Sequence, residues 1–318
     1  MADSDLTLPG QEVRTRDFSP PGLIQYCLLL LLILFSPGPR SFSGDQAGAD
    51  QSPMFLWSTT IGETQVFLLG SIHVLKHNPA DTDERVERAY KSCSRIVFEA
   101  DMDEMALPET RMMMVKAGLL PEGETLDSHI GKETKDLLQE RLESSEFGMD
   151  TFLRFRPWLT AVTLTAHELK RLGFDVAYGI DTSLYRRAKR DGKDSAFLET
   201  AQAQIETLSS MPEAIQEDLL MQTLHELKVI EERSSEIVSA WKRGDAQALE
   251  EITTISLRNY PSVYERLFVA RNRNWVDRIE RLSENQNALL VVVGAAHLVG
   301  DHGILALLRE KGYTAVQL

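Results

Sequence analysis

One stretch near the C-terminus constrains the fold more than any other part of the chain. Residues 287–294 read Asn-Ala-Leu-Leu-Val-Val-Val-Gly, which is apolar at nearly every position. A strand with one face in water alternates apolar and polar side chains, whereas a strand that helices cover on both faces is a continuous apolar run. The stretch therefore predicts an α/β fold around a central sheet.

Shorter apolar runs predict the other strands. Residues 54–70 read as a β-hairpin around Gly62, and a charged helix over 81–94, with Asp81 as its N-cap, separates this hairpin from a strand over 95–99. Strand, helix and strand together have the length of a β-α-β unit, which indicates a parallel pair. Two further strands are expected over 195–199 and 313–317, and further helices over 103–117, 132–144, 157–172, 182–190, 212–244 (one helix or two), 245–257, 263–283 and 301–311.

The domain organisation follows from this pattern. No strong linker interrupts residues 53–318, so we expect a single α/β domain there, with a helical insertion over about 103–193. With 48 acidic and 34 basic side chains the chain has a formal net charge of -14, which makes nucleic acid a poor partner. Cys93 is the one cysteine beyond residue 52, so a disulfide framework is excluded. The oligomeric state stays open.

Residues 1–52 are expected to lie outside the domain. Residues 23–35 form an apolar run of about 13 residues, whereas a membrane-spanning helix needs roughly 20. The run fits the apolar core of a secretory signal, and the segment after it is rich in Pro, Gly and Ser. The stretch before it is more acidic than an export signal should be. This leaves open an uncleaved anchor, a start upstream of the true one, or a buried helix or tail of a cytosolic protein. We expect an exported, periplasmic or membrane-anchored protein.

The pattern Gly-x-x-His occurs twice, each time directly after an apolar strand: Gly70 to His73 and Gly294 to His297. A third strand ends at Glu99. Ligands of open α/β sheets bind outside the carboxyl ends of parallel strands, so we expect these side chains to meet at one edge. Two neutral imidazoles and a carboxylate can hold a divalent ion, whose bound water loses a proton near neutral pH.

Other polar residues have weaker signals. Glu199 ends the strand over 195–199 and is a candidate for proton transfer, although it and Glu99 could each be half of an ion pair. Arg271 and Asn272 lie on an expected helix, where Arg271 could clamp a substrate carbonyl or carboxylate or be solvated. Asp181 is expected to cap the helix over 182–190. The methionines at 102, 105 and 112–114 form either an adaptable binding groove or the packed face of a helix.

Taken in order, the motifs resemble those of the TraB/PrgY/GumN family, which includes the TIKI-type proteases. The segments that carry this resemblance are GSIHV (70–74), FEAD (98–101), LPEGETL (120–126), YGID (178–181), FLET (197–200), ARNRNW (270–275) and VVVGAAHLVGDHGILALLREKGY (291–313).

The resemblance implies a mixed central sheet with flanking helices, related to the erythromycin-esterase and ChaN-like group. It also implies a metal-dependent hydrolase, a peptidase acting on exported or cell-envelope peptides and supported by manganese or cobalt. We expect a divalent ion (manganese, cobalt or zinc) held by His73, His297 and Glu99. Catalytic roles fall to Glu99, Glu199, Arg271 and Asn272, the last two positioning substrate or stabilising an oxyanion. Because ChaN-like relatives bind haem, a non-catalytic haem- or peptide-binding envelope protein is the alternative.

Overall fold

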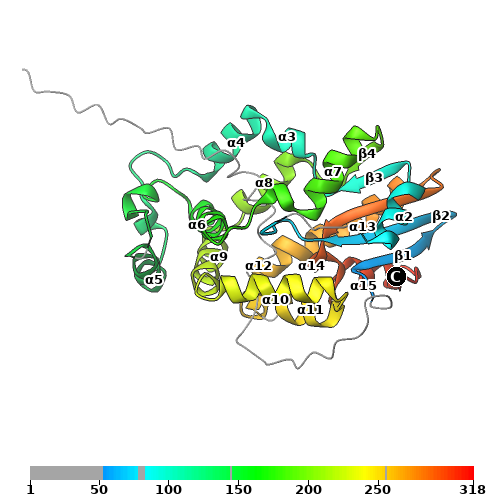
Figure 1. Ribbon diagram of the computed structural model, residues 1–318. Helices are drawn as coiled ribbons and strands as arrows, with labels where there is room; N and C mark the ends of the chain where they lie inside the picture. Colours follow the sequence, from blue (N-terminus) through cyan, green and yellow to red (C-terminus); the bar gives the residue numbers. More distant parts are fainter. Residues whose placement is uncertain (1–52, 78–82, 144, 255) are drawn as a thin grey trace, which may run out of the picture.

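The computed structural model describes residues 53–77, 83–143, 145–254 and 256–318, and these form a six-stranded sheet with helices on both sides (Figure 1). The expected signal or anchor segment over 1–52 and the expected cap Asp81 lie outside the described residues. Within the described ranges, Asp83 caps the first helix by accepting a hydrogen bond from the Arg85 N–H at 2.8 Å. No helix of the described residues is long and apolar enough to cross a membrane.

The sheet is mixed, which confirms the expected fold class; the erythromycin-esterase and ChaN-like grouping stays a prediction. Its strand order is β4-β3-β5-β2-β1-β6. The first four of these are parallel, and β1 runs antiparallel to both of its neighbours. The strands are β1 (Leu56–Ile61), β2 (Thr64–Ser71), β3 (Arg95–Phe98), β4 (Asp194–Phe197), β5 (Ala288–Gly294) and β6 (Val316–Gln317).

The β-hairpin around Gly62 is confirmed, since Ile61 pairs with Thr64 across a two-residue turn. The expected parallel pair of β2 and β3 is wrong in one respect. Both strands run in the same direction, but β5 pairs with each of them and separates them. The reason is that β5 is the most apolar strand and takes the central position, where both of its faces are covered.

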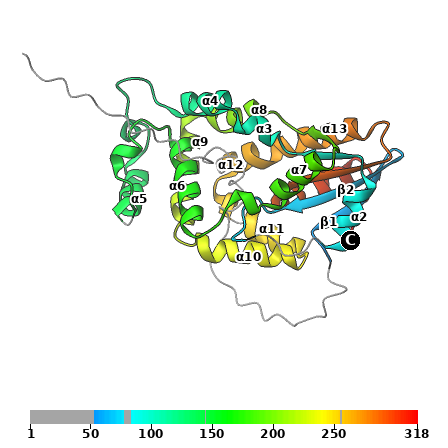
Figure 2. The same cartoon turned by 45° about the horizontal axis from the view of Figure 1, so that its top comes forward.

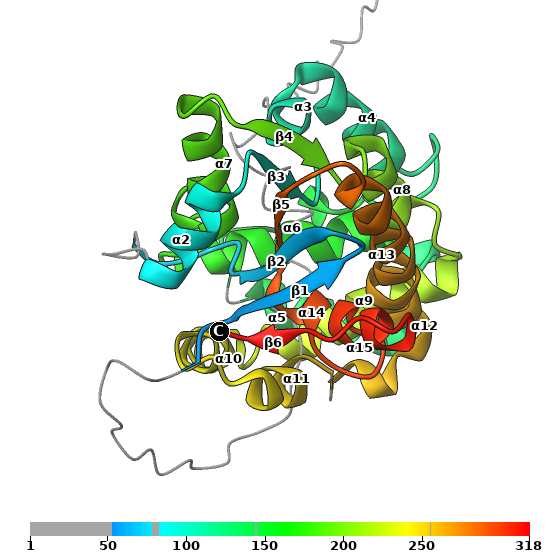
Figure 3. The same cartoon turned by 90° about the vertical axis from the view of Figure 1, so that its right-hand side faces the viewer.

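Side chains of β5 alternate between two apolar clusters. Leu290 and Val292 pack with α2 and α7 on one face, whereas Leu289, Val291 and Val293 join the larger cluster on the other. Figure 3 shows α2 and α7 on one side of the sheet and α13 and α15 on the opposite side. Figure 2 shows α5, α6 and α9 grouped away from the sheet.

The helices follow the sequence expectations with a few differences. The expected helix over 103–117 is two helices, because Pro108 starts a new one and disfavours helical backbone at Leu107. Two short helices, α8 and α14, were not expected. The helices are α2 (Glu84–Ser92), α3 (Met102–Ala106), α4 (Pro108–Gly118), α5 (Lys132–Glu143), α6 (Pro157–Arg171), α7 (Ile180–Arg190), α8 (Ala201–Ser209), α9 (Glu213–Glu226), α10 (Ile230–Lys242), α11 (Ala246–Thr254), α12 (Pro261–Tyr264), α13 (Ala270–Ser283), α14 (Ala295–Leu298) and α15 (Ile304–Glu310).

Gly70 lets two parts of the backbone approach closely. A Cβ atom there would lie 2.3 Å from Cδ1 of the fully buried Phe55 and 3.0 Å from Cα of Ala295. We expect Gly70→Ala to lower the free energy of unfolding by about 1–3 kcal/mol in urea titrations, because the packed ring cannot yield without strain. Gly148→Ala is the control: nothing lies within 4 Å of its Cβ and its φ is -90°, so a change within about 0.5 kcal/mol is expected. Equal effects of the two substitutions would contradict this reasoning.

Candidate functional site

Four parallel strands deliver polar side chains to the same edge of the sheet. Glu99 directly follows β3, Glu199 lies two residues after β4, and His73 lies two residues after β2. His297 lies on α14, the short helix that begins where β5 ends. The predicted convergence of these side chains is confirmed. Arg271 contacts Glu99, Glu199 and His297, and Glu99 in turn lies beside His73.

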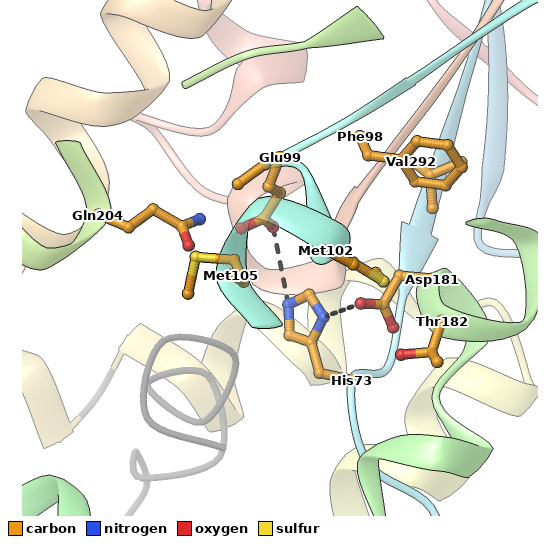
Figure 4. Close-up of a pocket in the computed structure, with 10 residues that line it drawn as sticks. His73, Phe98, Glu99, Met102, Met105, Asp181, Thr182, Gln204 and Val292 are labelled. Carbon is orange, nitrogen blue, oxygen red and sulfur yellow. Dashed lines mark ion pairs between the residues drawn. The ribbon is translucent and has the colours of Figure 1, made fainter. Parts of the chain in front are cut away.

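His73 lies between two carboxylates and is only 3% exposed. Its Nε2 is 3.6 Å from Oε1 of Glu99, and its Nδ1 is 3.0 Å from Oδ2 of Asp181 (Figure 4). Burial alone would lower the pKa of His73, but the negative charge of Asp181, aided by Glu99, outweighs it and raises the pKa above its usual value. The geometry therefore favours a positively charged or proton-accepting imidazole.

The expected capping role of Asp181 is wrong. Helix α7 begins at Ile180 and its N-cap is Gly179, so Asp181 lies inside the first turn with its side chain buried. A Cβ atom at Gly179 would lie 2.3 Å from the carbonyl oxygen of His73, and this close approach brings the start of α7 against the histidine. Sequence reasoning missed this contact because a short polar residue near a helix start resembles a cap.

His297 is held in one tautomer by Asn272. Nδ1 of His297 lies 2.5 Å from Oδ1 of Asn272, whose Nδ2 donates to the carbonyl of His302 at 2.8 Å. Because the amide nitrogen is committed to His302, the amide oxygen faces the imidazole, and Nδ1 carries the proton. Nε2 keeps its lone pair. Burial and the nearby Arg271 hold the pKa of His297 well below its usual value, so the ring is neutral.

Arg271 contacts three of the four side chains at the strand ends. Its Nη2 donates to Oε1 of Glu199 at 2.5 Å and to Oε2 of Glu99 at 3.4 Å. Its Nη1 donates to the carbonyl of Leu267 at 3.1 Å and lies 3.4 Å from Nε2 of His297. Leu267 belongs to a π-helical turn (Glu265–Val269) between α12 and α13, where the sequence predicted one unbroken helix. Such turns are frequent at functional sites.

Glu99 is a buried carboxyl group with three polar neighbours. Its Oε1 accepts the Gly294 N–H at 2.7 Å, which explains how the second motif glycine contributes to the site. Burial raises the pKa of Glu99, although His73, Arg271 and the Gly294 N–H favour its charged form. Burial therefore makes this carboxyl group easier to protonate than an exposed glutamate.

Glu199 has partners that sequence reasoning did not identify. Nε2 of Gln204, on the unexpected helix α8, donates to Oε1 at 2.9 Å, and Nε1 of Trp275 donates to Oε2 at 3.3 Å. The indole ring of Trp275 also lies 4.3 Å from the ring of His297, measured between centroids. Trp275 ends the motif over 270–275, so the motif itself was the available signal.

The metal-binding set of His73, His297 and Glu99 was expected from the sequence. Among the described residues, no group of three or more His, Cys, Asp or Glu side chains surrounds one point as a metal site does, and the Arg271 guanidinium contacts both Glu99 and His297. However, both ring nitrogens of His73 and both carboxylate oxygens of Asp181 are buried without a hydrogen bond of good geometry. Nδ1 of His73 and Oδ2 of Asp181 nevertheless face each other at 3.0 Å. Nε2 of His73 is 3.6 Å from Oε1 of Glu99, beyond hydrogen-bond distance, so this nitrogen is the one that could bind a further species.

The mixed sheet and the buried histidine–glutamate–arginine cluster at its carboxyl edge define an α/β protein with a polar site at strand ends. Comparison with protein families gives the more specific result. The chain belongs to the TraB/PrgY/gumN family, whose model matches residues 55–317.

Individual relatives add to this assignment. An uncharacterised protein of Escherichia coli, YbaP, is 27% identical over 256 residues, which cover 79% of this chain and 90% of the relative. The zebrafish (Danio rerio) metalloproteases TIKI1 and TIKI2 are each 22% identical, covering 91% and 81% of this chain and 68% and 60% of their own lengths. No solved structure matches the chain.

Proposed function

We propose that the protein is a metal-dependent hydrolase, and more specifically a peptidase that acts on exported or cell-envelope peptides. The observation that carries this proposal is the meeting of two buried imidazoles and a buried carboxylate at one sheet edge, with Nδ1 of each imidazole facing an acceptor side chain. Histidines that bind metal ions commonly donate their second ring N–H to such an acceptor, which fixes the orientation of the ring. The likeness to two metalloproteases, at 22% identity, supports the same class.

The proposed chemistry is general acid–base hydrolysis. Glu99 takes a proton from the attacking water, whose oxygen forms a bond to the carbonyl carbon of the peptide. The bond from that carbon to nitrogen then breaks, and the proton passes from Glu99 to the leaving amine. Asp181 faces Nδ1 of His73 and would stabilise positive charge that the ring gains, either from a proton or from a bound ion, beside the developing oxyanion.

Arg271, Glu199 and Asn272 support these groups. The hydrogen bonds of Arg271 go to Glu199, Glu99 and Leu267, so its geometry favours holding Glu99 in place. Both polar ends of the Asn272 amide are likewise engaged, with His297 and with the carbonyl of His302. Their expected roles in positioning substrate or stabilising an oxyanion stay predictions.

The side chains at this edge fit a divalent metal ion by their chemistry. Neutral imidazole nitrogens and a carboxylate suit manganese, cobalt and zinc. His73 would bind the ion as a neutral ring, with its Nδ1–H facing Asp181 and its Nε2 available to the ion. His73, His297 and Glu99 would hold the ion. When bound, it would lower the pKa of a coordinated water and so supply a nucleophile near neutral pH.

Substitution of the two motif histidines tests the proposal. His73→Ala and His297→Ala should each lower the rate of metal-stimulated peptide cleavage by about 100-fold or more, while the far-UV circular dichroism spectrum is unchanged. Elemental analysis should find a divalent metal in the wild type and less in both variants. His225→Ala is the matched control. His225 is an exposed residue near the end of α9, so this substitution should leave the cleavage rate unchanged. Full activity in both motif variants would end the proposal.

The same samples separate the alternative function. A Soret band on adding haem, together with no cleavage of a peptide library, would support a non-catalytic haem-binding protein. Cleavage without a Soret band would support the hydrolase.

We also propose that the protein is exported or attached to a membrane, on the strength of the apolar run over 23–35. Cell fractionation of the tagged full-length chain should place it outside the cytoplasm or with the membrane. N-terminal sequencing of the purified protein distinguishes a cleaved signal from an anchor. A cytosolic chain that keeps residue 1 would contradict export.

A further inference from the structure

A cavity opens directly beside the contact between His73 and Glu99, and most of its wall is apolar (Figure 4). The cavity has a volume of about 30 Å³ as it stands, so a side chain could enter it only if the flexible methionine side chains in its wall moved aside. Its apolar wall is formed by Phe98, Ala100, Met102, Met105 and Val292. The cavity is therefore adjacent to the proposed catalytic groups but differs from them in chemistry.

The wall has a rigid part and an adjustable part. Phe98 and Val292 come from neighbouring strands of the sheet and are at most 1% exposed, so their positions are fixed by the core. Met102 and Met105 come from the five-residue helix α3, and methionine side chains are unbranched and adapt to the shape of a ligand.

The methionines at 102, 105 and 112–114 were expected to form either an adaptable groove or the packed face of a helix, and the structure shows some of each. Met105 and Met114 are buried in the larger apolar cluster, and Met102, which is half-buried, packs against the smaller one. Met112 and Met113 are exposed on α4 and are not part of the cavity wall. Among the methionines that the structure describes, Met102 and Met105 of α3 are the two that line the cavity.

We propose that this cavity holds an apolar side chain of the peptide substrate, on a residue next to the bond that is cut. The inference rests on the proposed hydrolase function and names its substrate class. A peptide whose scissile carbonyl lies at Glu99 and His73 would have a neighbouring side chain within reach of the apolar wall. The two carboxylates that reach the cavity, Glu99 and Asp181, already face His73, so a charged side chain entering it would displace that contact or stay unpaired.

The first test measures cleavage preference. In a peptide library varied at the residues flanking the cut, Leu, Met or Val next to the bond should be cleaved at least about tenfold faster than Gly, Asp or Lys there. Met102→Ala enlarges the cavity and should shift the preference toward larger side chains such as Phe. Met112→Ala is the matched control, since this methionine lies outside the cavity, and the preference should stay as in the wild type.

The second test does not depend on turnover. Methyl groups of methionine are labelled with ¹³C, and N-acetyl-leucine amide or N-acetyl-aspartate amide is added to the full-length protein. The leucine compound should shift the signals of Met102 and Met105 and leave those of Met112 and Met113 unmoved, whereas the aspartate compound should shift none of them.

The two tests separate failure of this inference from failure of the proposed function. Cleavage without an apolar preference, or with a preference for Lys or Asp, overturns the inference and leaves the hydrolase standing. Selective shifts at Met102 and Met105 without cleavage of any peptide support an apolar-ligand pocket and overturn the peptidase. Absence of both cleavage and shifts overturns both.

Discussion

Replacing Arg271 with methionine is expected to lower the free energy of unfolding by about 3–5 kcal/mol. The guanidinium lies between two carboxylates that are almost fully enclosed, with side-chain exposures of 7% for Glu99 and 10% for Glu199. Removing the cation leaves two neighbouring negative charges without their partner in a medium that solvates charge poorly. Urea or thermal unfolding, followed by circular dichroism, measures the effect.

Arg273 provides the control for this experiment on the same helix. Its guanidinium pairs with Glu265 at 3.4 Å, but both side chains are more than half exposed, so Arg273→Met should change stability by less than about 1 kcal/mol. The double variant Arg271→Met with Glu199→Gln should regain part of the loss, because one buried charge is removed with its partner. A loss below 1 kcal/mol for Arg271→Met would show that the cluster does not depend on this cation.

The strand ends at the site could be predicted because the information is local. An apolar run, a glycine and a histidine three residues later all lie within one short segment, and parallel strands bring such segments to one edge. Once β2, β3, β4 and β5 were identified as strands of one sheet, His73, Glu99, Glu199 and His297 were expected to be neighbours. This expectation required no knowledge of the strand order.

The strand order itself was not predictable from local pattern. The β-α-β spacing between β2 and β3 placed them side by side, whereas β5, almost 190 residues further along the chain, pairs between them. This outcome depends on which strand best fills the centre of the sheet, a competition among distant segments. Helices α8 and α14 were missed for a related reason, since short helices depend on tertiary packing more than on their own sequence.

The roles of Arg271 and Asp181 also depended on tertiary structure. Arg271 was a candidate substrate clamp or a solvated residue, and the fold instead surrounds it with carboxylates from two strand ends. Asp181 was assigned to a helix cap, and the close approach at Gly179 turns it toward His73. In both cases the sequence identified a polar residue near the site, but its partner came from a distant segment.

Replacing Asp181 with asparagine should lower kcat for peptide cleavage by about 100-fold, with a much smaller change in KM. The carboxylate lies 3.0 Å from Nδ1 of His73 and stabilises positive charge on that ring. Asparagine has nearly the same shape but no charge, so the fold should be retained while the imidazole loses its negatively charged neighbour. A kcat loss with little effect on KM means that the interaction matters in the transition state more than in substrate binding.

A control and a second readout distinguish this role from a purely structural one. Asp191 lies at the C-terminal end of the same helix, whereas Asp181 lies in its first turn. Asp191 accepts a hydrogen bond from the hydroxyl of Tyr90, so Asp191→Asn should leave kcat unchanged. Because Asp181 raises the pKa of His73, Asp181→Asn should lower that pKa, which NMR titration of the imidazole measures without substrate. If Asp181→Asn keeps full kcat while the His73 pKa falls, the charge on His73 has no part in catalysis, and Glu99 and His297 must carry the chemistry without it.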